Sequence, residues 1–245
     1  MQRYKIKIEY DGTPFVGWQY QKNGLSVQKV LQDAIFSISK EKTIITGAGR
    51  TDSGVHALAQ VAHFDLKKKI PKKNLLPAIN QNIINKSVTV LKINKVNKNF
   101  HARHEAQKRT YLYLIINRQS PLTLEKNKAW HIRKKLNINF MKKGAKLLLG
   151  THNFSTYRAA SCGAKSPIRT MEKILIKKNK DKIILQFTSR SFLQQQVRSM
   201  VGCIKYLGEG KWNFNDFKYS LKSESRSKCA PPAPACGLYL KKISY

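Results

Sequence analysis

The stretch GAGRTDSGVHA, residues 47 to 57, places a single carboxylate, Asp52, inside a glycine-rich loop. Acidic residues are scarce elsewhere: 13 Asp and Glu stand against 47 Lys and Arg in 245 residues, which gives a formal net charge of +34. An Asp in such a turn often does no more than accept hydrogen bonds from backbone N–H groups. The loop alone therefore leaves a structural and a catalytic interpretation open.

Other kinds of site share features with this loop, and the sequence disfavours each of them. Gly47, Gly49 and Gly54 lack the Rossmann spacing, and no GK[ST] follows that would cradle phosphates. The triplet at residues 52 to 54 imitates that of aspartic proteases, whose chemistry uses two carboxylates that share a proton. No second triplet of that kind occurs in the chain, and a protease that completed the pair by dimerising would not need this charge.

The charge balance indicates a polyanionic partner, with nucleic acid as the leading candidate. Part of the excess fits the codon bias of an AT-rich genome, since Lys, Asn and Ile are all abundant. The remainder exceeds what a solvated surface needs, so we expect binding that weakens strongly with salt. No apolar run approaches the roughly 20 residues that span a bilayer, and the N-terminus has a strand pattern, which predicts a cytoplasmic protein without a membrane partner.

Cysteine usage indicates a reducing compartment. The chain has no CxxC pair, so we expect free thiols and no metal site. The four cysteines are Cys162, Cys203, Cys229 and Cys236.

Hydrophobic periodicity predicts alternating strands and helices in the first half of the chain. Alternation predicts a strand, helical spacing after the candidate N-cap Ser26 predicts an amphipathic helix, and Pro77 is expected to kink a second helix. The order is β-α-loop-β-α-β, with strands at 3–10, 58–66 and 87–93 and helices at 27–38 and 72–84.

The second half contains the same ingredients without a visible sequence repeat. Strands are predicted at 109–117, 168–176, 183–189 and 237–243, and helices at 140–149, 192–207 and 214–221. Residues 223–236 are Ser- and Pro-rich and are predicted as a surface loop. Runs of strands with interspersed helices favour an α+β fold of two α/β halves, with mixed or antiparallel sheets flanked by helices. We expect the boundary near residues 100 to 106, which gives an N-terminal half of 1–104 and a C-terminal half of 105–245.

Five stretches in the same order resemble the tRNA pseudouridine synthase A family. The loop GAGRTDSGVHA resembles the family's catalytic loop, in which an Asp nucleophile lies in a G-R-T-D-x-G-V-H-A context. The other four are YDGTPFVGWQ (10–19), FHARHEAQKRTYLYLI (100–115), FLQQQVRSMVG (192–202) and GLYL (237–240). The resemblance implies the pseudouridine synthase fold, with an RNA-binding cleft between the halves.

The resemblance also implies an activity and partners. It implies conversion of uridine to pseudouridine at positions 38 to 40 of the tRNA anticodon stem-loop, by a homodimer, without metal or organic cofactor. The uridine must leave the stack and enter a pocket for its glycosidic bond to be broken and remade. Asp52 matches the nucleophile, and the sequence leaves open whether it attacks C6 of the uracil or C1′ of the ribose, or acts first as a base.

The family's other motifs assign roles to further residues. Arg198 matches the arginine that pairs with the catalytic Asp and keeps it ionised. Tyr111 matches the tyrosine that stacks on the flipped uracil, although Tyr113 lies on the same face of a strand and both are alternatively core aromatics. The polar run 194–196 departs from the family pattern at the start of the Arg198 helix, and is expected either to loosen the entry of that helix or to contact RNA.

Three more residues are candidates for substrate binding. Arg50 is expected to contact phosphate or to fill the space that the flipped nucleotide leaves, with a loop-stabilising salt bridge as the alternative. His56 is expected to orient the loop or to bind phosphate, with structural packing as the alternative. Arg103 lies in a motif, Phe100 to Arg103, that is expected to hold the halves together, and is a candidate RNA contact.

Two rival functions remain at this stage. The charge by itself would suit a basic RNA-binding protein without catalysis, but such a protein gains nothing from the Asp52 carboxylate in an RNA-facing cleft. An RNA methyltransferase would need a methyl-donor site, and no glycine-rich strand-to-helix turn with a following acidic residue is evident.

Overall fold

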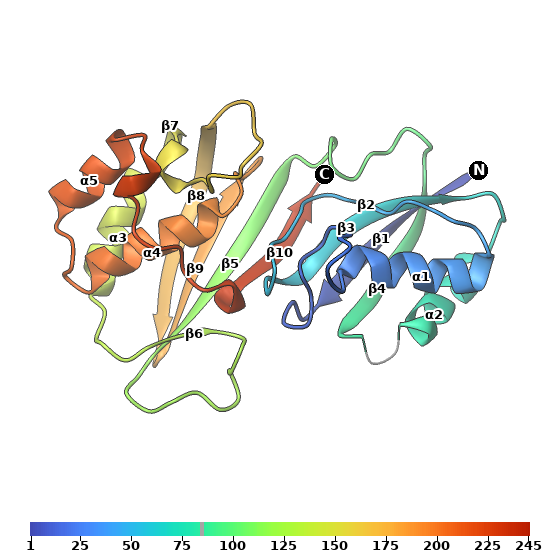
Figure 1. The fold of residues 1–245 in the computed structure, drawn as a ribbon, viewed down its shortest axis with the longest axis horizontal. Helices are drawn as coiled ribbons and strands as arrows, with labels where there is room; N and C mark the ends of the chain where they lie inside the picture. The colour runs from blue at the N-terminus through green and yellow to red at the C-terminus, as the bar shows by residue number, and fades with distance from the viewer. Residues whose placement is uncertain (84–85) are drawn as a thin grey trace. The chain divides into compact units, whose positions relative to one another are not determined.

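In the computed structural model, which describes residues 1–83 and 86–245, the chain forms two compact units (Figure 1). Unit 1 comprises Met1–Gln107 and Tyr239–Tyr245, and unit 2 comprises Lys108–Leu238. The sequence prediction divided the chain after residue 104 and assigned the last strand to the second half. In the structure the last strand belongs to unit 1, because Tyr239 and Leu240 pair with the first residues of the strand that follows the Asp52 loop.

Unit 1 is a mixed sheet with two helices on one face (Figure 1). Its strands lie in the order β4-β1-β3-β10, with β2 beside β3; β10 runs parallel to β3, and the other pairs are antiparallel. The alternating pattern of β1 puts Tyr4, Ile6, Ile8 and Tyr10 in the core. The elements are β1 (Gln2–Tyr10), α1 (Val27–Ser39), β2 (Thr46–Gly47), β3 (His56–Leu66), α2 (Lys72–Asn82), β4 (Val88–Val96) and β10 (Leu238–Ser244).

The predicted helix cap of unit 1 is found where expected, and helix α2 continues through Pro77 without interruption. The Ser26 side chain accepts a hydrogen bond from the Lys29 N–H and caps α1, and Lys40 ends that helix in the left-handed conformation at φ 61°. Pro77 lies inside α2. The predicted end of that helix at Ile84 lies outside the described residues.

Unit 2 is a mainly antiparallel sheet with three helices. Its strands lie in the order β5-β9-β8-β7, and β6 runs parallel to β5. The strands are β5 (Lys108–Asn117), β6 (Trp130–Ile132), β7 (Gly150–Asn153), β8 (Ile168–Asn179) and β9 (Lys182–Ser189). The helices are α3 (Ile138–Leu147), α4 (Gln196–Gly208) and α5 (Phe214–Lys222), with 3-10 turns η1 (Ser155–Tyr157), η2 (Arg226–Lys228) and η3 (Ala235–Gly237).

Helix α4 begins four residues later than the sequence predicted. Gln195 adopts the left-handed conformation at φ 60°, which no regular helix tolerates, so the helix starts at Gln196. The Gln196 side chain is fully buried and accepts a hydrogen bond from the Leu193 N–H at 2.8 Å. The polar run 194–196 therefore forms a turn that leads into the helix, of which only Gln196 is part.

The segment predicted as a surface loop, residues 223–236, instead packs partly against α4. Ala230 and Ala233 are buried, and the Ala233 N–H donates to the Arg198 carbonyl at 3.0 Å. A Cβ atom built on Gly202 would lie 2.1 Å from the Pro231 carbonyl oxygen. Backbone therefore packs directly on backbone here, which only a glycine permits.

We predict that Gly202→Ala lowers the free energy of unfolding by about 1 to 3 kcal/mol, because the added methyl group must push the backbone at Pro231 away from α4. The matched control is Gly163→Ala, where an added Cβ meets nothing within 4 Å. Urea denaturation of both variants measures the difference. Equal stability of the two would contradict the close packing at Gly202.

Candidate active site

The Asp52 loop lies between β2 and β3 and is fixed by backbone contacts with residues 15–18. Asp52 and Gly17 form an isolated antiparallel bridge, and the Trp18 N–H donates to the Thr51 carbonyl at 3.0 Å. Gly17 has φ +122°, and a Cβ there would lie 2.7 Å from the Thr51 oxygen. The loop can approach this closely only because residue 17 has no side chain.

Polar side chains of β1 and β3 also hold the Asp52 loop by hydrogen bonds. The Tyr10 and Thr51 hydroxyls share a buried hydrogen bond of 2.8 Å. The Gln60 side chain, fully buried on β3, donates to the Gly49 carbonyl at 2.8 Å. These bonds, one buried and one partly buried, hold the residues on either side of Arg50, so the backbone that carries Asp52 has little freedom to move.

His56 is the first residue of β3 and is only 2% exposed. Its Nδ1 accepts the Gly12 N–H at 2.9 Å, and its ring stacks on Tyr239 with centroids 4.6 Å apart. This environment favours the loop-orienting role over direct contact with phosphate. Arg50, two residues before Asp52, is exposed.

The segment Phe100–Arg103 is bound to the sheet of unit 1. The Ala102 N–H donates to His63 Nδ1 at 3.2 Å, and the Tyr245 hydroxyl donates to the Ala102 carbonyl at 2.8 Å. Burial lowers the pKa of His63 to about 4, which keeps its ring neutral and able to accept this bond at neutral pH. The Arg103 side chain is exposed beside this anchored backbone.

The two candidate tyrosines of unit 2 have different surroundings on the same face of β5. The Tyr113 hydroxyl donates to the Pro234 carbonyl at 2.8 Å, and burial raises the pKa of this side chain above its usual value. Tyr111 lies two residues nearer the start of β5 and packs edge-on against Phe192, with centroids 5.1 Å apart. Tyr113 is thus a core residue, which favours Tyr111 as the functional one of the pair.

Arg198 lies in the first turn of α4 and is oriented by the segment that packs on this helix. Its Nε donates to the Ala233 carbonyl at 2.7 Å, while the Ala233 N–H donates to the Arg198 carbonyl. Two bonds to the same residue fix both the backbone and the plane of the guanidinium. Asp52, Arg50, His56 and Arg103 therefore belong to unit 1, and Tyr111 and Arg198 to unit 2.

Comparison with known proteins gives the family of this chain. A sequence model described as tRNA pseudouridine synthase matches residues 6–105 and 145–245, which include every one of these candidate residues except Tyr111. The chain belongs to that family. Its members are isomerases that make pseudouridine in tRNA, and this protein is one of them, with the α+β pseudouridine synthase fold.

Relatives named tRNA pseudouridine synthase A match along the full length of the chain. That of Pelagibacter ubique is 55% identical over 246 residues, which cover 100% of both chains. That of Maricaulis maris is 46% identical, over 100% of this chain and 98% of its own. A solved structure, the crystal structure of a Cbf5-Nop10-Gar1 complex, gives a TM-score of 0.37 at 13% identity over 82% of this chain and 44% of that one, too weak a likeness to carry an argument.

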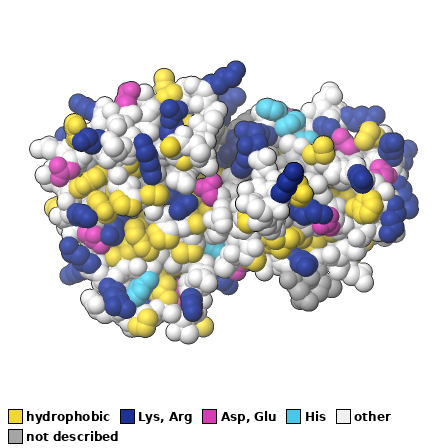
Figure 2. Space-filling view, viewed as in Figure 1, with side chains coloured by type: hydrophobic (Ala, Val, Ile, Leu, Met, Phe, Trp, Pro, Cys, Tyr) yellow, Lys and Arg dark blue, Asp and Glu magenta, His cyan; other side chains and the backbone are white. Residues whose placement is uncertain are grey.

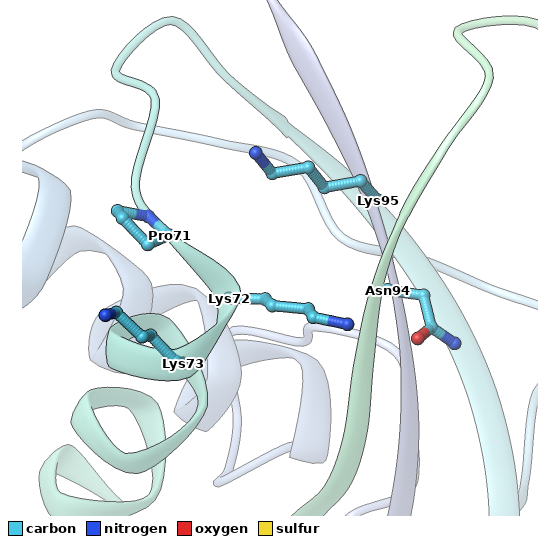
Figure 3. Close-up of a pocket in the computed structure, with 5 residues that line it drawn as sticks. All are labelled: Pro71, Lys72, Lys73, Asn94 and Lys95. Atoms are coloured by element: carbon cyan, nitrogen blue, oxygen red, sulfur yellow. The ribbon is translucent and has the colours of Figure 1, made fainter.

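Basic side chains line two hollows on unit 1 of this synthase. One, of about 450 Å³, lies on the open face of the sheet, opposite the helices, and its lining includes Lys5, Lys7 and Lys92. The other, of about 460 Å³, is lined by Pro71, Lys72, Lys73, Asn94 and Lys95. Figure 3 shows Lys72 reaching from the start of α2 toward Asn94, which lines both hollows. We call the two hollows together the lysine groove.

The lysine groove places like charges side by side. Lys7 of β1 and Lys92 of β4 occupy directly paired positions, an arrangement that costs stability in an antiparallel sheet. No carboxylate lines either hollow in the part of the chain that the structure describes. Figure 2 shows Lys and Arg side chains spread widely over the visible face, with few Asp or Glu among them.

Across residues 1–83 and 86–245, no group of three or more His, Cys, Asp or Glu side chains is placed to hold a metal ion. Within the same residues, no helix combines the length and the apolar character that crossing a membrane requires.

We predict that Tyr111→Phe and Tyr113→Phe act on different properties. Tyr113→Phe removes the bond to Pro234 and lowers the free energy of unfolding by about 1 kcal/mol, with tritium release from C5-labelled tRNA nearly unchanged. Tyr111→Phe keeps the stacking ring but removes the hydroxyl, which the family resemblance implies helps to take the proton from C5, so it lowers tritium release while the unfolding transition stays in place. The opposite pattern would make Tyr113 the functional tyrosine.

Proposed function

We propose that this synthase converts uridine to pseudouridine at positions 38 to 40 of the tRNA anticodon stem-loop, with Asp52 as the nucleophile. The observation that carries the proposal is the Asp52 loop, whose backbone is fixed by the bridge to Gly17 and by buried bonds at Thr51 and Gly49. A pure RNA-binding protein has no need of a carboxylate held in this way. The positions in tRNA come from the resemblance to the tRNA pseudouridine synthase A family.

The chemistry requires a carboxylate that is ionised at neutral pH. A carboxylate that attacks the uracil or the ribose forms a covalent intermediate, which divides one difficult step into two. Removal from water raises the pKa of a carboxyl group, whereas a nearby cation lowers it. We assign the cationic role to Arg198, whose guanidinium is held through Nε by Ala233.

The flipped uracil needs a stacking partner in place of its lost neighbours. An aromatic ring provides about 1 to 3 kcal/mol per stacked base. Tyr111 takes this role in the proposal, because the Tyr113 hydroxyl is bound to backbone in the core. Arg50 and Arg103, both exposed, are proposed as contacts to the RNA, and His56 as the residue that orients the loop.

The lysine groove is proposed to bind tRNA phosphates away from the reacting nucleotide. The side-by-side lysines cost stability in the free protein, and a phosphate backbone compensates that cost on binding. Contacts of this kind position the RNA without reading its sequence. We further expect a homodimer, as the resemblance implies, and a cytoplasmic location, as the N-terminal sequence pattern indicates.

We predict that Asp52→Asn abolishes tritium release from tRNA labelled at C5 of uracil, because the amide cannot act as the nucleophile. Binding of tRNA should stay within about twofold of the wild type, because the affinity comes chiefly from cationic contacts to phosphates, which this substitution leaves in place. Filter binding and tritium release are measured on the same preparations. Release by the variant at the wild-type rate would refute the assignment of Asp52.

We predict that Arg198→Gln slows tritium release and moves the acidic limb of its pH profile to higher pH. Loss of the positive charge raises the pKa of the catalytic carboxyl group, so a larger fraction of the enzyme is protonated at a given pH. Arg198→Lys, which keeps the charge, should retain the position of that limb. A slower reaction with an unshifted limb in Arg198→Gln would leave Arg198 without an electrostatic role toward Asp52.

We predict that replacing Lys7, Lys72 and Lys92 together by Gln lowers the slope of log affinity for tRNA against log salt by roughly 2 to 3, since each lost phosphate contact reduces it by about 0.7 to 0.9. The matched control replaces Lys142, Lys143 and Lys218, three exposed lysines on α3 and α5, and removes the same charge. Equal slopes for the two triple variants would exclude the lysine groove as a preferred phosphate surface.

A further inference from the structure

Two cysteines that are distant in the sequence lie against each other in unit 2. The sulfur atoms of Cys203 and Cys229 are 3.6 Å apart. Cys203 is fully buried on α4, whereas Cys229 follows η2 and is partly exposed. A disulfide requires the sulfur atoms to come within about 2.05 Å, so a shift of about 1.5 Å separates the two thiols from a bond.

The neighbours of the pair make the two thiols unequal. Arg226 donates through Nη1 to the Ser199 hydroxyl at 2.8 Å, beside Cys229. The hydrogen bond from Cys203 lowers the pKa of Cys229, and the positive charge of Arg226 lowers it further. The same bond, together with burial, raises the pKa of Cys203. Cys229 is therefore the thiol that ionises and reacts, and Cys203 is in place to resolve the product.

We propose that Cys203 and Cys229 form a reversible oxidation site of this synthase that reacts with hydroperoxides. The Cys229 thiolate attacks the peroxide, the O–O bond breaks, and with hydrogen peroxide a sulfenic acid and hydroxide form. The Cys203 sulfur then attacks the Cys229 sulfur, the S–O bond breaks, and the disulfide forms as a second hydroxide leaves. The two hydroxides take up the two thiol protons and become two water molecules. In total, two thiols are oxidised to a disulfide and one peroxide is reduced.

The disulfide would act on the segment that holds Arg198. Cys203 belongs to a helix buried on nearly all sides, so closing the bond must move the Cys229 segment. Two residues further on, the Pro231 carbonyl already lies against Gly202 with no room to approach. The displacement therefore passes to Ala233, whose carbonyl fixes the Arg198 guanidinium. The expected loss of activity rests on the function proposed above for Arg198, whereas the formation of the disulfide does not.

The covalent step is tested on the reduced, full-length protein treated with hydrogen peroxide. Peptide mapping without reductant should find Cys203 linked to Cys229, and dithiothreitol should reverse the link. Cys162→Ala should form the same link, because Cys162 is outside the pair, and Cys229→Ala should form none. Failure of the wild type to form the link while Cys162 is oxidised would overturn the proposal, whatever the activity shows.

The functional step is tested by tritium release from the same samples. Oxidised wild type should lose most of its activity and regain it with dithiothreitol, whereas Cys229→Ala should keep its activity under the same peroxide. A complete disulfide with unchanged activity would overturn the coupling to Arg198. Absence of release from reduced wild type would instead refute the proposed function and leave the result of the peptide mapping in force.

Discussion

The backbone bridge between Gly17 and Asp52 is the contact on which the candidate active site depends. It joins the segment after β1 to the loop before β3, and it exists only because residue 17 has no Cβ to strike the Thr51 carbonyl. The bonds from Tyr10 and Gln60 then hold the flanking residues of the loop. A carboxylate fixed by its backbone in this way needs little reorganisation when the substrate arrives.

Unit 2 contains the same kind of contact beside its own candidate site residue, Arg198. The segment after α5 lies directly on α4, which Gly202 permits, and its Ala233 binds both the backbone and the guanidinium of Arg198. In each unit a glycine allows one backbone to approach another, and the approach holds the backbone of a charged residue, Asp52 in unit 1 and Arg198 in unit 2. Of the proposed thiol pair, Cys203 lies on α4 and Cys229 lies in the same segment, four residues before Ala233. A shift of Cys229 would therefore be carried along the backbone to the residue that binds Arg198.

Part of the positive charge of the chain is concentrated in unit 1, where lysines lie close together. A mere excess of lysine from codon bias would favour positions where the charges are far apart and well solvated. Lys7 and Lys92 instead occupy paired positions in a sheet, within a groove that reaches the start of α2. Repulsion at such a site is tolerable when a polyanion occupies it, which fits an enzyme whose substrate is tRNA.

The sequence by itself determined the family, the α+β class, the α-helices and the longer strands, because motifs and periodicity are local signals, whereas it missed the short strands β2, β6 and β7. It also identified the helix cap Ser26, and it singled out Asp52 and Arg198 as candidates for the reaction. Only the tertiary structure decided that α4 starts at Gln196, that the segment after α5 packs on α4, and that the last strand belongs to unit 1. It also separated the surroundings of Tyr111 from those of Tyr113 and brought Cys203 to Cys229. The physical reason is that these features depend on contacts between residues far apart in the chain, made partly by backbone atoms that every residue type carries.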